Sequence, residues 1–300
     1  MSRFSDCVRN LASACVQPLV RCAARGYVAG ALAEDAMRVA RRLHDRGYGI
    51  TLGYWDGVQD NPAGVSAKYL HDLKLLADSG FDAYESIKLP GLGMSTQRAL
   101  EVLEAGRERG IRVHFDALWI GTADATWDLI ELAAIRGHST SGTLPGRWSR
   151  SVRDAERACE LNVPVRVVKG QSPDPGDAAH DPRQGYIDVV RTLAGRATHV
   201  AVATHDVGLA EASLELLQAA GTPCDLELLF GLPWRDVSAV AKRRGVKVRF
   251  YVPYGEAYLP YCLSQASRHP VVLWRLMKDS WRGMLGSSDT ALSPDAVAAG

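Results

Sequence analysis

The stretch HVAVATHDVGLAEASLELLQAAGTPCDLELLFG, residues 199–231, contains one complete strand–helix–strand unit. Residues 199–206 and 224–231 are short apolar runs of the length and composition typical of buried strands. The segment between them has apolar residues at helical spacing and ends at Gly221, the usual kind of residue at a helix C-terminus. The stretch therefore predicts a strand, a helix and a second strand in succession.

The same pattern occurs along most of the chain, at a spacing of about 30 residues. The expected strands are 49–55, 85–89, 112–119, 142–148, 164–170, 199–206, 224–231 and 247–254. Eight such repeats predict the α/β class and a (β/α)8 TIM-type barrel. The main alternative is an open doubly wound sheet, but no GxGxxG motif follows the first strand.

Additional helices are expected at both ends of the barrel. Residues 1–46 predict an N-terminal helical extension, with helices near 1–24 and 31–46. Residues 47–284 contain the barrel and two C-terminal helices near 256–268 and 270–284, the first of which we expect to be a lid helix. The small, polar residues of 285–300 predict a flexible tail.

The composition excludes several classes of protein. The net charge of +1 gives no electrostatic basis for binding nucleic acid or an anionic membrane. No apolar run approaches the roughly 18 residues of a membrane helix, and the N-terminus lacks an apolar signal core. The six cysteines form no CxxC pair, as expected for a reduced protein. Together these features predict a cytoplasmic protein.

Polar residues gather where the expected strands end, which is where a barrel of this kind carries its active site. They are Asp56, Lys88, His114, Asp116, Trp148, Arg166, Lys169, Thr204, His205, Asp206, Glu227 and Tyr251. Barrel interiors are normally apolar, so these side chains require a ligand or mutual pairing. Two structural interpretations remain open: Lys88 and Asp116 as an ion pair closing the barrel, and His205 as a core histidine.

Metal and serine-nucleophile chemistry are disfavoured by the motifs. His114 has no histidine-rich partner segment that would supply the roughly three protein ligands of a catalytic metal site. No nucleophile elbow is present either. By contrast, Arg166 and Lys169 in RVVKG (166–170) suit an electron-rich, partly anionic ligand such as a phosphate or a flavin. A solvated pair of charges at the rim is the alternative.

Six segments, taken in their order along the chain, resemble the catalytic barrel of the proline dehydrogenases, which are FAD enzymes. The resemblance covers about residues 25–275 and rests on SIKL, HFDA, RVVKG, ATHD, LELLFG and VRFYVPYGEAYLPY. It implies that FAD lies over the barrel mouth, with Arg166 near the flavin N5 atom. The cofactor-binding residues it implies are Arg166, Val168, Lys169, Gly170, Gln171, Thr204, His205, Asp206, Glu227 and Arg268. The substrate-site positions it implies are Lys88, Asp116, Tyr251, Tyr261, Ser264 and Gln265.

The chain departs from the family pattern where the family binds the substrate carboxylate. The family helix reads Tyr-x-x-Arg-Arg-x-x-Glu, and its two arginines clamp the carboxylate of proline. After Tyr261, this chain has Ser264 and Gln265 in the arginine positions and Arg268 in the glutamate position. Loss of such a bidentate clamp makes proline a poor substrate. Asp206 and Glu227 also stand where the family usually has Asn and Gln.

The sequence therefore predicts an FAD-dependent amine dehydrogenase or oxidase that acts on a donor other than proline. A hydride would pass from carbon or nitrogen to flavin N5 and leave an imine-like product. A modified amino acid or a hydrazine or amine intermediate of specialised biosynthesis would be such a donor, and the electron acceptor (quinone, oxygen or a carrier) stays open. Two alternatives remain: a proline dehydrogenase with a rearranged carboxylate site, in which Lys88 or Arg268 meets the carboxylate, and a flavin-free barrel acting as a binding protein or non-redox enzyme.

Overall fold

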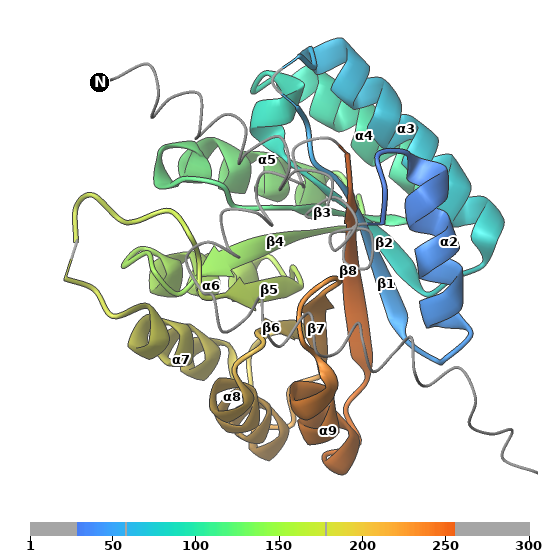
Figure 1. Ribbon diagram of the computed structural model, residues 1–300. Coiled ribbons are helices and arrows are strands. Elements are labelled where there is room, and N and C mark those ends of the chain that lie inside the picture. The colour runs from blue at the N-terminus through green and yellow to red at the C-terminus, as the bar shows by residue number, and fades with distance from the viewer. Residues whose placement is uncertain (1–28, 58, 178, 256–300) are drawn as a thin grey trace, which may run out of the picture. The chain divides into compact units, whose positions relative to one another are not determined.

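Eight parallel strands close into a barrel in chain order, β1 to β8 (Figure 1). The computed structural model describes residues 29–57, 59–177 and 179–255. The strands are β1 (Gly49–Tyr54), β2 (Ala83–Ile87), β3 (Arg112–Phe115), β4 (Thr140–Pro145), β5 (Val165–Val168), β6 (Val200–Ala203), β7 (Cys224–Leu229) and β8 (Val248–Tyr254). Strand β1 pairs in parallel with both β2 and β8, which closes the sheet. The predicted (β/α)8 barrel is confirmed, and the open-sheet alternative is wrong.

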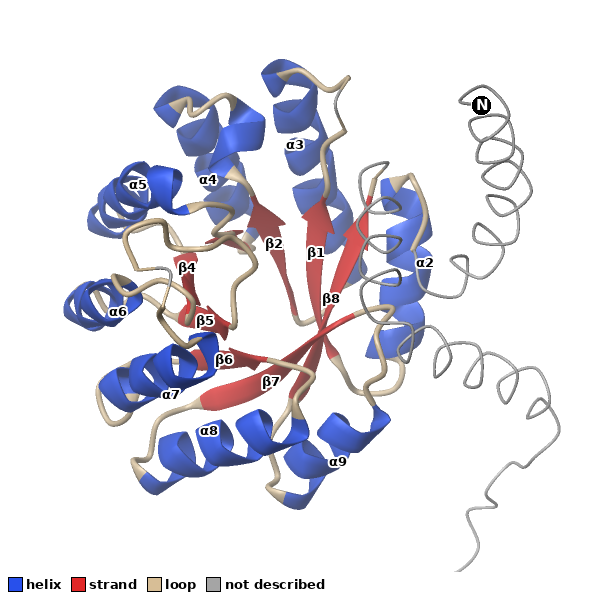
Figure 2. Ribbon diagram, turned by 60° about the vertical axis from the view of Figure 1, so that its left-hand side comes forward, coloured by secondary structure: helices blue, strands red, loops and turns tan. Residues whose placement is uncertain are grey.

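Helices surround the strands (Figure 2). They are α2 (Ala33–His44), α3 (Pro62–Ser79), α4 (Thr96–Arg109), α5 (Ala123–Ile135), α6 (Ser151–Glu160), α7 (Pro182–Leu193), α8 (Val207–Ala219) and α9 (Arg235–Arg243), with short 3-10 turns η1 (Leu89–Leu92) and η2 (Ile120–Thr122). Local sequence sets their ends. In α3, the Asn61 side chain accepts a hydrogen bond from the Gly64 amide, and Gly80 ends the helix with φ 67°.

The two faces of the barrel wall carry different side chains, because successive residues of a strand point to opposite faces. Outward-facing residues such as Ile50, Leu52 and Phe115 are fully buried against the helices and form the apolar core. Inward-facing residues are largely polar, and Tyr84, His114 and Arg166 among them are also buried. The polar interior leads toward the C-terminal ends of the strands, where the candidate site lies.

The bounds of some elements differ from those expected. The strand predicted at 85–89 begins two residues earlier, at Ala83, so Lys88 follows its end. Strand β4 ends at Pro145, which places Trp148 beyond it. The helix expected at 31–46 is α2. The helices predicted near 1–24, 256–268 and 270–284, including the lid helix, and the tail 285–300 lie outside the described residues, so the proposed domain division stays a prediction.

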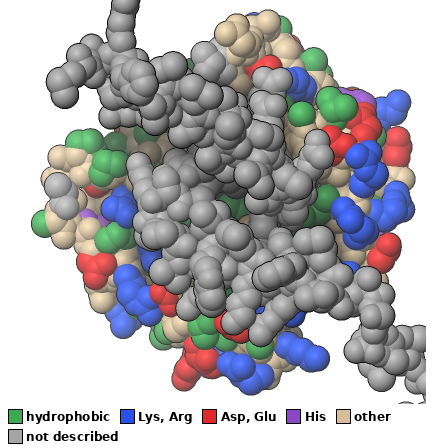
Figure 3. All heavy atoms as spheres, in the orientation of Figure 1, with side chains coloured by type: hydrophobic (Ala, Val, Ile, Leu, Met, Phe, Trp, Pro, Cys, Tyr) green, Lys and Arg blue, Asp and Glu red, His purple; other side chains and the backbone are tan. Residues whose placement is uncertain are grey.

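Charges of both signs are distributed around the described part of the molecule. On the face shown in Figure 3, lysine and arginine side chains alternate with aspartate and glutamate around the periphery. This mixture agrees with the net charge of +1. Within the described part of the chain, every helix is too short or too polar to cross a membrane.

Candidate active site

Arg166, on β5, lies at the centre of the polar interior and is buried. It binds Glu227 on β7 in a bidentate manner, with Nε 3.1 Å from Oε2 and Nη2 2.9 Å from Oε1. Its Nη1 donates to Asp116 Oδ1 at 2.5 Å. Longer contacts reach Ser86 at 3.4 Å and the Tyr84 hydroxyl at 3.3 Å. A guanidinium has five N–H donors, so each donor of Arg166 faces an acceptor.

Glu227 is held as a carboxylate by this arrangement. Burial acts to raise the pKa of Glu227, but Arg166 and the Tyr84 hydroxyl outweigh burial, and the pKa is lowered. Burial likewise disfavours the charge of Arg166, yet Glu227 and Asp116 offset it, so the pKa of Arg166 is raised. The two groups therefore form a buried ion pair that is charged at neutral pH.

Asp116, which follows β3, joins Arg166 to the aromatic side of the mouth. The Tyr251 hydroxyl donates to Asp116 Oδ2 at 3.0 Å, and the Trp55 indole N–H donates to the Tyr251 hydroxyl at 3.1 Å. Gly53 provides the space for Tyr251, because a Cβ atom at Gly53 would lie 2.2 Å from the tyrosine oxygen. Burial, then the charge of Asp116, raises the pKa of Tyr251, so Tyr251 acts as a neutral donor.

Lys88 lies near Asp116 but makes its shortest contact elsewhere. Its Nζ donates to the Tyr54 carbonyl oxygen at 2.6 Å, whereas Asp116 Oδ2 is 3.9 Å away. The Trp55 ring is 5.5 Å from the ammonium. Burial lowers the pKa of Lys88, and the charges of Asp116 and Asp56 oppose that shift. The predicted Lys88–Asp116 pair is thus present, at the outer limit of an ion pair.

His114 serves the packing of the interior. Its two ring nitrogens contact the hydroxyls of Ser141 and Thr143 at 2.8 and 2.7 Å. Burial, reinforced by the charge of Arg166, holds the pKa of His114 well below its usual value. Both nitrogens are occupied by protein groups. Within the described ranges, no group of three or more His, Cys, Asp or Glu side chains is arranged to hold a metal ion.

The ends of β4 and β5 carry positive charge that could meet a phosphate. Gly170 has φ +85°, and its carbonyl accepts a hydrogen bond from Arg147 Nε at 3.1 Å. Lys169 is exposed and Arg147 half-buried. Neither forms an ion pair with a carboxylate of the described residues, although the charge of Lys169 is among the causes that lower the pKa of Asp206. Gln171 is exposed next to them, and Val168 is half-buried on β5. This set fits the diphosphate of a dinucleotide.

Thr204, His205 and Asp206 shape the loop after β6. The Leu229 amide donates to His205 Nε2 at 3.0 Å, and His205 Nδ1 lies 2.9 Å from the Pro233 carbonyl oxygen. Asp206 caps helix α8 through the Leu209 amide at 2.9 Å and pairs with Arg183. The Thr204 hydroxyl accepts from the Asp206 amide. Their proposed cofactor contacts stay a prediction.

Three residues of the site were missed by the sequence reasoning: Tyr84, Ser86 and Trp55. Tyr84 precedes the strand as it was expected, and an aromatic or serine residue in a strand normally indicates packing. The signal that could have found Tyr84 and Ser86 is alternation, because both share a strand face with Lys88.

Trp148, by contrast, is a structural residue whose indole donates to the Ser172 carbonyl at 3.0 Å. The expected residues Tyr261, Ser264, Gln265 and Arg268 lie outside the described residues.

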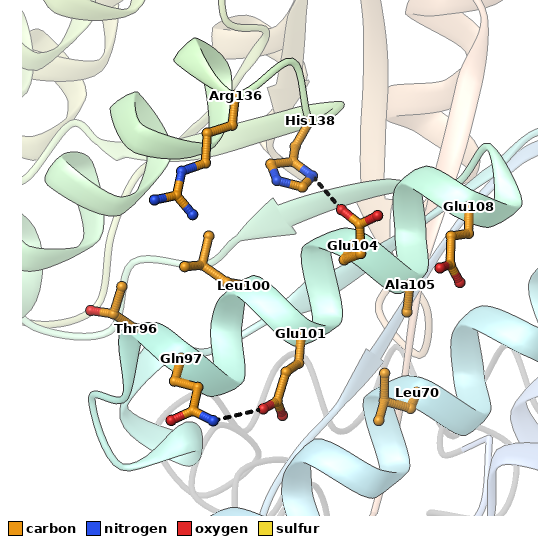
Figure 4. A pocket seen from close by; sticks show the side chains of 10 residues that line it. All are labelled: Leu70, Thr96, Gln97, Leu100, Glu101, Glu104, Ala105, Glu108, Arg136 and His138. Carbon is orange, nitrogen blue, oxygen red and sulfur yellow. Dashed lines mark hydrogen bonds and ion pairs between the residues drawn. The ribbon is translucent and has the colours of Figure 1, made fainter.

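A separate hollow lies on the outer wall of the barrel (Figure 4). It has a volume of about 860 Å³ and is lined by Leu70 of α3, a row of α4 residues and two residues after α5, Arg136 and His138. In Figure 4, His138 faces Glu104, and their closest N–O distance is 4.0 Å. The hollow includes none of the residues that the sequence singled out.

The comparisons with known proteins agree with this fold and with the resemblance in sequence. Proline dehydrogenase 1 of Bacillus subtilis subsp. natto is 21% identical over 266 residues, covering 83% of this chain and 88% of that protein. Proline dehydrogenase of Deinococcus radiodurans is 25% identical over 268 residues, covering 82% of this chain and 86% of that protein. This chain is similar in sequence to these proline dehydrogenases over most of its length. No protein-family profile matches the chain.

Solved structures show the same barrel. Proline utilization A from Bdellovibrio bacteriovorus superposes with a TM-score of 0.74 at 16% identity, over 93% of this chain and 35% of that chain. Proline utilization A from Corynebacterium freiburgense superposes with a TM-score of 0.69 at 14% identity, over 92% of this chain and 34% of that chain. This chain therefore spans about a third of the length of those proteins, and the likeness concerns the fold alone.

Proposed function

We propose that the protein is an FAD-dependent oxidoreductase that takes a hydride from an amine-like substrate and gives an imine-like product. The observation that carries this proposal is the convergence of Lys88, Asp116, Arg166 and Tyr251 at the strand ends of a barrel related to proline dehydrogenases. Bound FAD would accept the hydride, and the protein would supply binding, orientation and exclusion of water.

The chain's own residues fit such a cofactor at two places. Arg147 and Lys169 at the ends of β4 and β5 would bind the diphosphate, because Lys169 is exposed and Arg147 half-buried and neither is ion-paired with a carboxylate of the described residues. Trp55 and Tyr251 provide aromatic surface at the mouth, and the Tyr251 hydroxyl is fixed by Asp116 and Trp55. Asp116 would in turn accept the proton of the substrate amine, or hold the amine through a hydrogen bond.

The substrate we propose lacks a free carboxylate. Arg166 is already engaged by Glu227 and Asp116 in the described structure, and a carboxylate bound to it would have to displace one of these partners at a cost of several kcal/mol. Lys88 donates one of its three N–H groups to the Tyr54 carbonyl. Ser264 and Gln265, which stand where the family has its arginines, support the same conclusion. An amine, a hydrazine or a modified amino acid whose carboxylate is masked fits this requirement.

Oxidation of proline is the second candidate. It is supported by the curated relatives, which are proline dehydrogenases, and by Lys88, whose ammonium lies beside the mouth only 3.9 Å from Asp116. A substrate carboxylate would then replace Asp116 as the partner of Lys88. A cytoplasmic location and the identity of the electron acceptor stay predictions for either substrate.

The test begins with the absorbance spectrum of the purified full-length chain after incubation with FAD and removal of free cofactor. The expected result is retention of the flavin bands, followed by bleaching under anaerobic conditions with neutral or cationic amines and not with proline. Bleaching by proline as fast as by any amine tested would favour the second candidate. A protein that retains no flavin would overturn the proposal.

A variant probes the carboxylate site directly. Ser264→Arg combined with Gln265→Arg restores the two charges of the family pattern and is expected to increase the rate of bleaching by proline. The matched control, Ser264→Ala with Gln265→Ala, alters the same positions without adding charge and should leave the slow rate with proline unchanged. Equal rates in both double variants would place the carboxylate site elsewhere.

A further inference from the structure

The charges around Arg166 are balanced within the protein. Arg166 and Lys88 supply two positive charges when Lys88 is protonated, and Asp116 and Glu227 supply two negative charges. Arg166 is 4% exposed and Glu227 2% exposed, so water screens this pair weakly. The bidentate contact of Glu227 is the larger part of the balance, because it occupies Nε and Nη2 at 3.1 and 2.9 Å.

Glu227 is fixed in place by more than Arg166. The Tyr84 hydroxyl donates to Glu227 Oε2, and two guanidinium groups lie near the Tyr84 ring, with Arg112 at 4.3 Å and Arg249 at 4.8 Å from its centre. Tyr84 therefore keeps the Glu227 carboxylate aimed at Arg166. A carboxylate that is held by two donors and buried acts as a permanent charge of the site.

We propose that Glu227 is a positioning residue that neutralises Arg166 and thereby sets the relative affinity of the site for oxidised and reduced FAD. The inference rests on the proposed function, which places FAD at this mouth. Reduction by one hydride adds a negative charge to the flavin unless a second proton follows. A free guanidinium would favour the reduced form, whereas a guanidinium compensated by Glu227 gives little such preference.

The inference has a matched control on the same strand. Asp225 lies two residues before Glu227 on β7, faces the interior, and binds Arg249 Nε at 3.1 Å, so it is a second buried arginine–carboxylate pair. Two residues along a strand correspond to about 7 Å, which places Asp225 deeper in the barrel and farther from the mouth. Substitution of Asp225 removes the same kind of charge at a greater distance from the proposed flavin.

The experiment compares full-length wild type with Glu227→Gln, Glu227→Asp and Asp225→Asn. Affinity for oxidised FAD is measured by titration, and the midpoint potential of bound FAD by spectroelectrochemistry. Glu227→Gln is expected to favour reduced over oxidised FAD by about tenfold more than wild type, equivalent to about 30 mV for a two-electron couple. Glu227→Asp and Asp225→Asn should both keep the wild-type potential.

The outcomes are separable. If Glu227→Gln keeps the wild-type potential, or Asp225→Asn shifts it equally, the role of Glu227 is overturned while the proposed function stands. If wild type binds no FAD, the proposed function fails, and this inference fails with it. Should Glu227→Gln not fold, wild type alone decides: the inference expects bound FAD to have a midpoint at or below that of free FAD, and a higher midpoint overturns it.

Discussion

Asp72 and Glu85 bring two carboxyl groups together between helix α3 and the outer side of β2. Both side chains are fully buried. The Tyr254 hydroxyl donates to Asp72 Oδ2 at 2.7 Å. Burial raises the pKa of Asp72 to about 7, and burial together with the charge of Asp72 raises the pKa of Glu85 well above its usual value. At neutral pH the pair is therefore at least partly protonated.

This pair predicts a specific dependence of stability on pH. Because Asp72 binds its proton more tightly in the folded state, wild type loses stability as the pH rises from about 4 through 7. Asp72→Asn removes that loss. We expect the unfolding free energy of the variant, relative to wild type, to increase by roughly 2–4 kcal/mol between pH 5 and 8.

The measurement is urea unfolding followed by circular dichroism at several pH values. Asp78→Asn, at an exposed aspartate of the same helix, is the matched control and should show no comparable increase over this pH range. A pH-independent difference for Asp72→Asn as well would mean that Asp72 is ionised normally in the folded protein.

Helices α3 and α7 begin alike but pack differently. Each starts with a proline after a capping Asn or Asp and has a glycine in its first turn. A Cβ atom at Gly185 of α7 would lie 2.1 Å from the Gly146 carbonyl oxygen, whereas one at Gly64 of α3 would have its nearest neighbour, Asn61 Oδ1, at 3.6 Å. Gly185 thus permits α7 to approach the end of β4, close to Arg147 and Gly170.

Gly185→Ala is therefore expected to destabilise the protein, because the obstructing atom belongs to the backbone and cannot rotate away. The expected loss is about 1–3 kcal/mol in the free energy of unfolding. Gly64→Ala serves as the control and should be neutral or slightly stabilising, since alanine favours helix over the unfolded chain. Thermal unfolding of both variants tests this, and equal effects would show that close packing at Gly146 is unimportant.

The whole barrel is organised around polar pairs rather than an apolar interior. Near the mouth, Arg166 pairs with Glu227. Deeper in the barrel, Arg249 joins three parts of the wall: its Nε donates to Asp225, its Nη1 to the Ile50 carbonyl at 2.7 Å, and its Nη2 to Asp82 Oδ1 at 2.9 Å. Arg249 therefore links β8 to β7, to β1 and to the start of β2, where the barrel closes.

Arg249→Met is expected to destabilise the barrel by about 3–5 kcal/mol, because it leaves Asp225 buried without its main partner. The double variant Arg249→Met with Asp225→Leu should recover much of this loss, since a buried pair replaced by apolar groups is often tolerated. Urea unfolding of both variants tests the prediction. A double variant less stable than the single one would indicate that the interior requires its charges for folding.

The local pattern of the sequence was sufficient to place the strands and helices of the described barrel. Glycine stops and recurring apolar runs predicted all eight strands, and the position of Lys88, Asp116, Arg166 and Tyr251 near the expected strand ends predicted that they lie at one mouth. Strand boundaries were predicted less accurately, because where a strand begins depends on its neighbours: β2 begins at Ala83, where it pairs with Ile50 of β1. Tyr84 was missed for that reason.

The sequence by itself determined the (β/α)8 order, because strand and helix periodicities are properties of neighbouring residues. Only the tertiary structure decided the partners within the barrel. Arg166 and Glu227 are 61 positions apart, and Asp116 and Tyr251 135 apart, so their pairing depends on closure of the sheet. The sequence identified a positive residue at the mouth, and the fold places two carboxylates against it, because parallel strands bring their inward-facing side chains to the same level of the barrel.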